Sequence, residues 1–144
     1  MLAEAPSAAA EILLLEQNSE QVALFAQAVS STRLTVVQDC PKILQFLRHE
    51  GPHADAQRPD LILLDLELSD PEGCVMLSDI KRDPQLRRIP VIVLATSDSY
   101  EHVSTAYDLH ANAYICKPES SDQFIQTLRA TLHFWLALAR LPRE

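Results

Sequence analysis

Short runs of apolar residues alternate along the chain with longer amphipathic segments. Three of the runs are continuous enough to be buried on both faces of a sheet, as parallel strands are. The five runs that predict strands cover residues 12–15, 34–37, 61–64, 91–94 and 113–116. The sequence shows neither an internal repeat nor a stretch of low complexity.

The segments between these runs have the apolar spacing of helices. Asn18 is a good N-cap, and apolar residues recur after it on one helix face. The other segments that predict helices cover residues 41–51, 71–83, 99–110 and 121–139. Strands that alternate with helices predict an α/β fold: one doubly wound, five-stranded parallel sheet with flavodoxin-like order 2-1-3-4-5 and helices on both faces.

Length and composition fit a single domain. The chain has 144 residues, of which 47% are apolar. We expect a loose N-terminal tail over residues 1–10, the domain over 11–139 and a C-terminal tail over 140–144. The first ten residues lack the charged start of a secretory signal, and no apolar run approaches the roughly 20 residues that cross a bilayer. We therefore expect a cytoplasmic protein with no membrane partner.

Charge and cysteine content narrow the function further. Lys and Arg total 12 against 20 Asp and Glu, which gives a formal net charge of −8 and argues against a nucleic-acid partner. The three cysteines, Cys40, Cys74 and Cys116, are odd in number and far apart, so they predict neither a disulfide framework nor a zinc site.

Charged and polar residues follow three of the predicted strands. Glu16 and Gln17 follow the first strand, Asp65 and Glu67 the third, and Lys117 the fifth. Ligands of such sheets bind outside the carboxyl ends of the strands, so we expect these side chains to meet there. Clustered carboxylates repel one another and need a nearby cation, which a lysine or a hydrated Mg²⁺ supplies.

Four segments resemble the signature segments of response-regulator receiver domains in two-component signalling: ILLLEQN, LILLDLELSDPEG, PVIVLA and YICKP. The intervals agree, because Gly73 and Ala95 lie 8 and 30 residues after Asp65, and Lys117 lies 22 residues after Ala95. The resemblance covers roughly residues 11–139. The segment SYEHVSTAYDLHANAYICKP and the pair Phe134 and Trp135 are most similar to the single-domain regulators that are encoded beside bacterial and cyanobacterial phytochromes.

The resemblance implies a phosphoacceptor protein rather than an ordinary enzyme. Asp65 would accept a phosphoryl group from a sensor histidine kinase, which the last likeness indicates to be of the phytochrome type. Lys117 would pair with a phosphoryl oxygen. Mg²⁺ would be held by Glu16, Asp65 and the backbone carbonyl of Glu67, and Tyr114 would be the aromatic of the conformational switch. The alternative without phosphorylation is that Asp65 only caps the turn after its strand, with Lys117 as its counter-ion.

Two residues depart from the family pattern. Gln17 stands where the family has an acidic metal ligand, so we expect weaker Mg²⁺ binding, with Glu67 as a partial replacement for the lost charge. Ala95 replaces the Thr or Ser of the switch, while Thr96 faces the other way and Ser97 lies further along the loop. An alternative function therefore stays open: a degenerate receiver that acts as a phosphorylation-independent dimeric adaptor.

The last predicted helix carries two apolar stripes. One is wide enough to cover the sheet. The other has the 4, 3, 4, 3 spacing of a helix seam on a face that a monomer would leave exposed. Its residues are Thr127, Thr131, Phe134, Leu138 and Leu141. This second stripe predicts a homodimer, as the resemblance also does.

Overall fold

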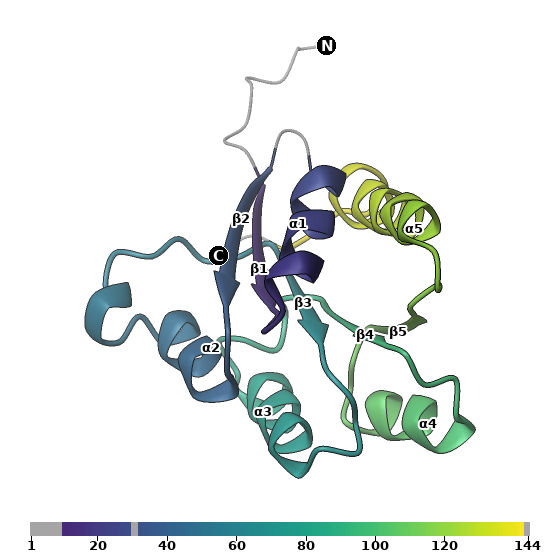
Figure 1. Cartoon of the computed structure of the whole chain (residues 1–144). Coiled ribbons are helices and arrows are strands. Elements are labelled where there is room, and N and C mark those ends of the chain that lie inside the picture. Colours follow the sequence, from purple (N-terminus) through teal and green to yellow (C-terminus); the bar gives the residue numbers. More distant parts are fainter. Residues whose placement is uncertain (1–9, 30–31, 143–144) are drawn as a thin grey trace.

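A computed structural model describes residues 10–29 and 32–142 of the chain. All strands of the described chain are parallel and form one sheet of order β2-β1-β3-β4-β5, which confirms the predicted fold class (Figure 1). The strands are β1 (Glu11–Leu15), β2 (Arg33–Val37), β3 (Leu61–Asp65), β4 (Val91–Ala95) and β5 (Ala113–Cys116). The predicted N-terminal tail, apart from Ala10, lies outside the described residues, and so does the end of the predicted C-terminal tail.

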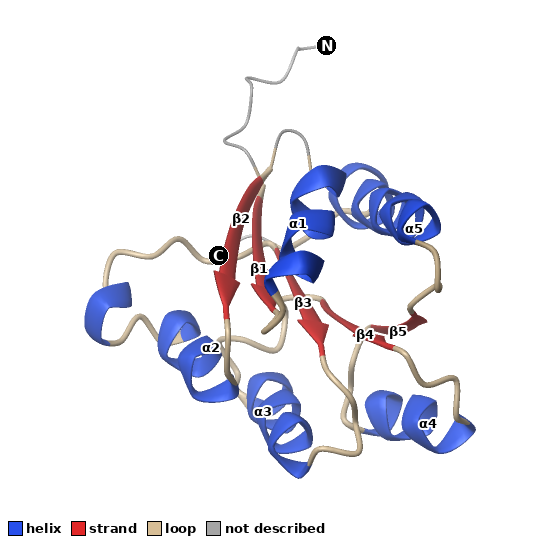
Figure 2. Ribbon diagram, viewed as in Figure 1, coloured by secondary structure: helices blue, strands red, loops and turns tan. Residues whose placement is uncertain are grey.

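Helices cover both faces of the sheet. Figure 2 shows α1 and α5 together on one side and α2, α3 and α4 on the other. The bounds are α1 (Ser19–Ala28), α2 (Cys40–Leu47), α3 (Pro71–Arg82), α4 (Tyr100–Asp108) and α5 (Ser121–His133), with a 3₁₀ turn at Gly51–His53 and a π-helical turn at Phe134–Leu138. Among the described residues, no helix is both long and apolar enough to cross a membrane.

Side-chain caps set where the helices begin. The Asn18 side chain accepts hydrogen bonds from the amides that open α1, as predicted, and Asp39, Asp70 and Ser120 do the same for α2, α3 and α5. The second helix ends at Leu47, earlier than predicted. His49 there takes a left-handed conformation, with φ of 58°, and its amide donates to the Phe46 carbonyl, which closes the helix.

The central strands carry the core. Ile12 and Leu14 of β1 face α1 and α5, whereas Leu13 and Leu15 face the opposite helix layer. All of Leu61–Leu64 in β3 is buried in the same alternating way. Each such side chain contributes about 1.5–3 kcal/mol when removed from water. This packing fixes the carboxyl ends of β1, β3 and β5, after which the charged residues follow.

The end of the chain differs from the predicted seam. Thr131 is buried, and its hydroxyl donates to the Thr127 carbonyl at 2.8 Å, so its prediction as an interface residue is wrong. At Phe134 the α-helix gives way to the π-helical turn, which ends at Leu138. Leu141 lies beyond the helix, so the regular spacing does not extend to it. Phe134 and Leu138 remain exposed, at 51% and 63%.

Candidate functional site

An ion pair joins the ends of β3 and β5. The Lys117 ammonium lies 2.8 Å from both carboxylate oxygens of Asp65, although 52 residues separate the two in sequence. The side chains are only 8% and 14% exposed for Asp65 and Lys117. Lys117 also lies 5.9 Å from the centre of the Phe124 ring. The expected meeting of these residues is confirmed, and little water screens their attraction.

Glu16, directly after β1, completes the charged cluster. One carboxylate oxygen accepts hydrogen bonds from the amides of Gln17 and Asn18, at 2.9 and 3.1 Å. The other oxygen is buried without a hydrogen-bond partner among the described residues. Burial raises the pKa of Glu16 to about 7, and the neighbouring Asp65 carboxylate acts in the same direction. Glu16 therefore stands beside Asp65, where a proton or a cation stabilises it.

The unpartnered Glu16 oxygen and the Asp65 carboxylate suit a hard cation such as Mg²⁺, which is commonly held by one or two carboxylates and several waters. The Glu67 carboxylate is not a third acid of this set. It accepts hydrogen bonds from the Thr96 amide and hydroxyl, both at 3.0 Å. Within the described ranges, no three His, Cys, Asp or Glu side chains are arranged to hold a metal. The charge missing at Gln17 is thus not replaced by Glu67.

The loop after β4 offers no hydroxyl in the expected place. Ala95 is fully buried, and its side chain cannot form a hydrogen bond. The Thr96 hydroxyl is used by Glu67. The Ser97 hydroxyl accepts from the Ser99 amide at 3.1 Å and lies 2.7 Å from Nδ1 of His102. Both hydroxyls that follow Ala95 are therefore engaged within the loops and α4.

Tyr114 ties β5 to this same loop. Its hydroxyl donates to the Ser97 carbonyl at 2.5 Å, while its backbone amide donates to the Tyr107 hydroxyl at 3.3 Å. Burial raises the pKa of Tyr114 above its usual value. The ring is half-buried, and its hydroxyl is fixed to the loop that follows β4. A movement of that loop would therefore shift the Tyr114 side chain or break its hydrogen bond.

The model of the response regulator receiver domain family matches residues 12–129. The chain belongs to the response-regulator receiver family. Response regulator Rcp1 of Synechocystis sp. is 34% identical over 137 residues, which cover 92% of this chain and 93% of Rcp1. These comparisons confirm the resemblance that the sequence segments carry.

Solved structures relate this receiver domain to regulators of phytochromes. It is similar to the phosphorylated cyanobacterial phytochrome response regulator RcpA, with a TM-score of 0.88, 41% identity and coverage of 94% of this chain and 100% of RcpA. It is also similar to the Mn²⁺-bound form of Rcp1, with a TM-score of 0.85, 33% identity and coverage of 93% and 99%. The chain is thus a response regulator of the receiver type related to phytochrome response regulators.

Sequence reasoning missed two contacts of the receiver site. The Glu67–Thr96 and Ser97–His102 pairs both join the loop after β4 to another segment. Glu67 and Thr96 lie 29 residues apart. No local spacing signals such a pair, because it depends on how neighbouring strands place their following loops.

The raised pKa of Glu16 predicts a pH dependence of stability. Without metal, the unfolded chain releases this proton near pH 4.5, while the folded domain holds it to about 7. The contribution of Glu16 to the unfolding free energy is therefore complete below pH 4.5 and is lost as the pH rises through 7. Relative to wild type, Glu16→Gln should gain up to about 3 kcal/mol across this interval.

Urea denaturation in EDTA between pH 4.5 and 8 measures this difference. The exposed Glu20, replaced by Gln in the same way, is the matched control. Parallel pH profiles for wild type and Glu16→Gln would show that Glu16 is not protonated in the folded domain.

Proposed function

We propose that this receiver domain accepts a phosphoryl group on Asp65 from a histidine kinase and signals through protein contacts. The observation that carries the proposal is the contact of Lys117 with both Asp65 oxygens, beside the buried Glu16. An Asp65 oxygen attacks phosphorus, the P–N bond to the kinase histidine breaks, and the imidazole nitrogen keeps the electron pair and takes up a proton. The product is an acyl phosphate, and Lys117 then pairs with a phosphoryl oxygen.

Mg²⁺ is the cofactor we propose for this step. Glu16, Asp65 and the Glu67 carbonyl would hold it. When bound, it neutralises charge on the transferring phosphoryl group. The Mn²⁺-bound form of Rcp1 supports a divalent ion in a relative. The neutral Gln17 reduces the attraction, so Mg²⁺ should bind more weakly here than with an acid at that position.

The kinase we propose is of the bacterial phytochrome type. This follows from the relatives, since RcpA is a phytochrome response regulator and the similar RPA3017 of R. palustris acts in red light signalling. RPA3017 has a TM-score of 0.84 and 30% identity. RcpA was crystallised phosphorylated, which supports phosphoryl acceptance in this group of regulators.

Incubation with acetyl phosphate, or with a phosphorylated phytochrome kinase, tests the function. With Mg²⁺, intact-protein mass spectrometry should show one added phosphoryl group, and hydroxylamine should remove it because the bond is an acyl phosphate. EDTA should suppress the uptake. Absence of uptake from both donors at high Mg²⁺ would overturn the proposal.

We also propose a homodimer through the end of the last helix. Phe134 and Leu138 are 51% and 63% exposed, which leaves two large apolar side chains on the surface of the turn that follows α5. Phe134→Asp places a charge on this surface, which would have to lose its water in the dimer. The variant should sediment as a monomer at concentrations where wild type is dimeric.

Val75→Asp is the matched control for this substitution. Val75 of α3 is 60% exposed, but it lies on another helix, so its variant should keep the wild-type mass in sedimentation velocity. An unchanged mass for Phe134→Asp would exclude this surface as the interface.

A variant pair separates phosphorylation from the adaptor alternative. Gln17→Asp restores the missing charge and should tighten Mg²⁺ binding roughly tenfold, as one added charge near the ion is worth about 1 kcal/mol or more. Ala95→Ser adds a hydroxyl with little added volume at the buried position. If the adaptor alternative holds, only the doubly changed protein takes up the phosphoryl group. Uptake by wild type as well favours the phosphoacceptor function.

A further inference from the structure

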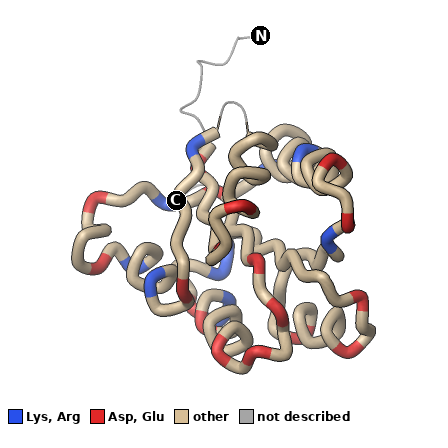
Figure 3. The backbone as a smooth tube through the Cα atoms, in the orientation of Figure 1, with Lys and Arg blue, Asp and Glu red and all other residues tan. Residues whose placement is uncertain are grey.

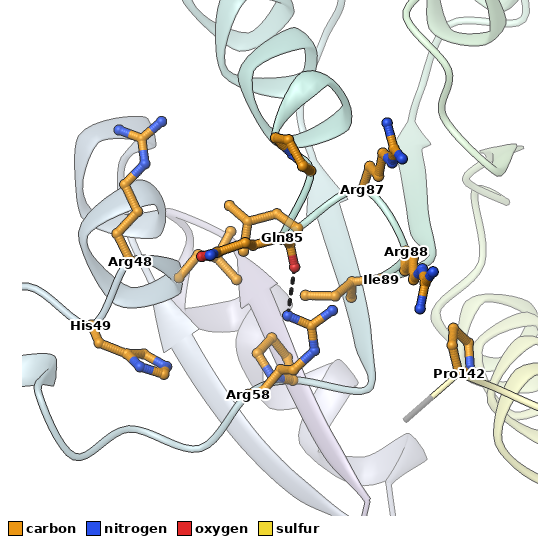
Figure 4. A pocket seen from close by; sticks show the side chains of 12 residues that line it. Arg48, His49, Arg58, Gln85, Arg87, Arg88, Ile89 and Pro142 are labelled. Carbon is orange, nitrogen blue, oxygen red and sulfur yellow. Dashed lines mark hydrogen bonds between the residues drawn. The ribbon is translucent and has the colours of Figure 1, made fainter. Parts of the chain in front are cut away.

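A cavity lies at the opposite end of the sheet from Asp65. It has a volume of about 560 Å³, and its lining comes from four segments (Figure 4). They are the end of α2, residues 58–59 before β3, residues 84–89 before β4, and Pro142 after the last helix. Since the segments before β3 and β4 contribute, the cavity stands at the amino ends of these strands. Nothing in the phosphoacceptor chemistry uses it.

The polar lining of the cavity is basic. Arg48, Arg58, Arg87, Arg88 and His49 belong to it, and none of the described residues that line it is Asp or Glu. The chain as a whole has 20 acidic and 12 basic residues, and acidic positions occur over most of its helices and loops (Figure 3). Four of the 12 cationic side chains therefore line one cavity, and none of the other described lining residues carries a negative charge.

The loop that carries Arg87 and Arg88 is held in place from beneath. The buried Lys81 ammonium donates to the carbonyls of Arg87 and Ile89, at 2.9 and 2.8 Å. Arg58 donates to the Gln85 carbonyl at 2.7 Å (Figure 4). These bonds occupy carbonyl oxygens that would otherwise repel an anion. They also fix the loop before a ligand arrives, which lowers the entropy cost of binding.

His49 enters the cavity wall from a conformation that favours glycine. Its φ is 58°, directly after α2, where helices commonly end in glycine. Figure 4 shows its ring directed from the end of α2 toward Arg58. A glycine would close the helix without strain but would leave this wall without a ring. The end of α2 alone therefore does not explain why this residue is histidine rather than glycine.

The remaining lining is apolar and firm. Leu47, Pro59, Leu86 and Ile89 are buried, so they form a floor that belongs to the core. An apolar floor with a cationic rim suits a ligand that has a flat organic body and a charged group. Guanidinium groups match phosphate oxygens in two-point hydrogen bonds. The volume also lies in the range of small-molecule sites, about 300–1,000 Å³.

We propose that this cavity binds a phosphate-bearing organic anion of nucleotide size. The phosphates meet Arg87 and Arg88 of the same loop, while the organic body covers the apolar floor. An acidic peptide offers carboxylates to the same arginines, but a hollow of about 560 Å³ with a buried apolar floor favours the small molecule. The ligand and a phosphoryl group on Asp65 can be bound together, because they occupy opposite ends of the sheet.

Isothermal titration calorimetry with the unphosphorylated full chain tests the proposal. The probes are ATP, inorganic tripolyphosphate, adenosine and a hexaglutamate peptide, in EDTA at low salt. The test variant is Arg87→Glu with Arg88→Glu, and the charge-matched control is Lys42→Glu with Arg129→Glu, at exposed positions outside the lining. ATP should bind wild type and control alike, and the test variant about 100-fold more weakly, since each charged hydrogen bond is worth about 1.5–3 kcal/mol.

The four probes separate the alternatives. Tripolyphosphate should bind more weakly than ATP, and adenosine more weakly still, if both rim and floor contribute. Added salt should weaken ATP binding. Equal affinity of ATP for wild type and the Arg87, Arg88 variant overturns the site, as does the absence of ATP binding. Equal affinity for tripolyphosphate and ATP would show that the organic body contributes nothing to binding. Tighter binding of hexaglutamate than of ATP would assign the cavity to an acidic peptide. None of these results bears on phosphorylation of Asp65.

Discussion

Replacement of Asp65 by Asn is expected to abolish phosphoryl uptake altogether. The amide keeps the shape of the side chain but removes the negative oxygen that attacks phosphorus. The amide oxygen still offers Lys117 a hydrogen-bond acceptor where the carboxylate was. The backbone pairing of β3 and β5 with β4 should therefore be unchanged. Hydroxylamine-sensitive label from acetyl phosphate or from phosphorylated kinase should fall from one group per chain to none.

The control for this loss is Asp108→Asn. Asp108 is the exposed last residue of α4, so its variant makes the same chemical change outside the site. It should be labelled like wild type. Residual label on Asp65→Asn at the wild-type level would show that another side chain accepts the phosphoryl group, and the role proposed for Asp65 would fall.

Replacement of Lys117 by Gln should give the second large effect, a loss of stability of about 3 kcal/mol or more. Asp65 is only 8% exposed and depends on this lysine at 2.8 Å. Without the ammonium, the Asp65 and Glu16 carboxylates share a buried site with no cation. Urea denaturation in EDTA measures the change, and Mg²⁺ should restore more stability to the variant than it adds to wild type, since the ion then supplies the missing charge.

Two comparisons show whether burial of the charge is the cause. Lys42→Gln removes an exposed ion pair with Asp39, at 3.8 Å, and should cost less than about 1 kcal/mol. Asp65→Asn combined with Lys117→Gln removes both charges and should be more stable than Lys117→Gln alone. If the double variant is as unstable as the single one, packing rather than charge explains the loss.

The contacts around Ala95 define what a phosphoryl group can change here. A phosphoryl group on Asp65 would meet no hydroxyl at the buried Ala95. The hydroxyls of Thr96 and Ser97 are already bonded to Glu67 and His102. A modification shifts a conformational equilibrium only through contacts that differ between the states. For the proposed phosphorylation of Asp65, the remaining route would run through Lys117, whose bonds to Asp65 would rearrange, and through the loop that Tyr114 holds by its hydroxyl.

The sequence by itself determined the elements of this fold and the residues at the strand ends. Continuous apolar runs select buried parallel strands, helical spacing and caps such as Asn18 select the helices, and their alternation restricts the topology. Glu16, Asp65 and Lys117 meet because parallel strands end at one edge of the sheet. Only the register of that sheet had to be correct, and the apolar pattern fixes it.

Only the tertiary structure decided which neighbours each side chain contacts. The Glu67 carboxylate bonds Thr96 instead of joining the acidic cluster. Thr131 is buried, and its hydroxyl bonds the Thr127 carbonyl of its own helix. The π-helical turn ended the seam before Leu141. The arginines of the cavity are scattered over residues 48–88, and they gather only once α2 and the segments before β3 and β4 pack together. Local patterns encode periodicity, whereas these choices depend on contacts between segments far apart in the chain.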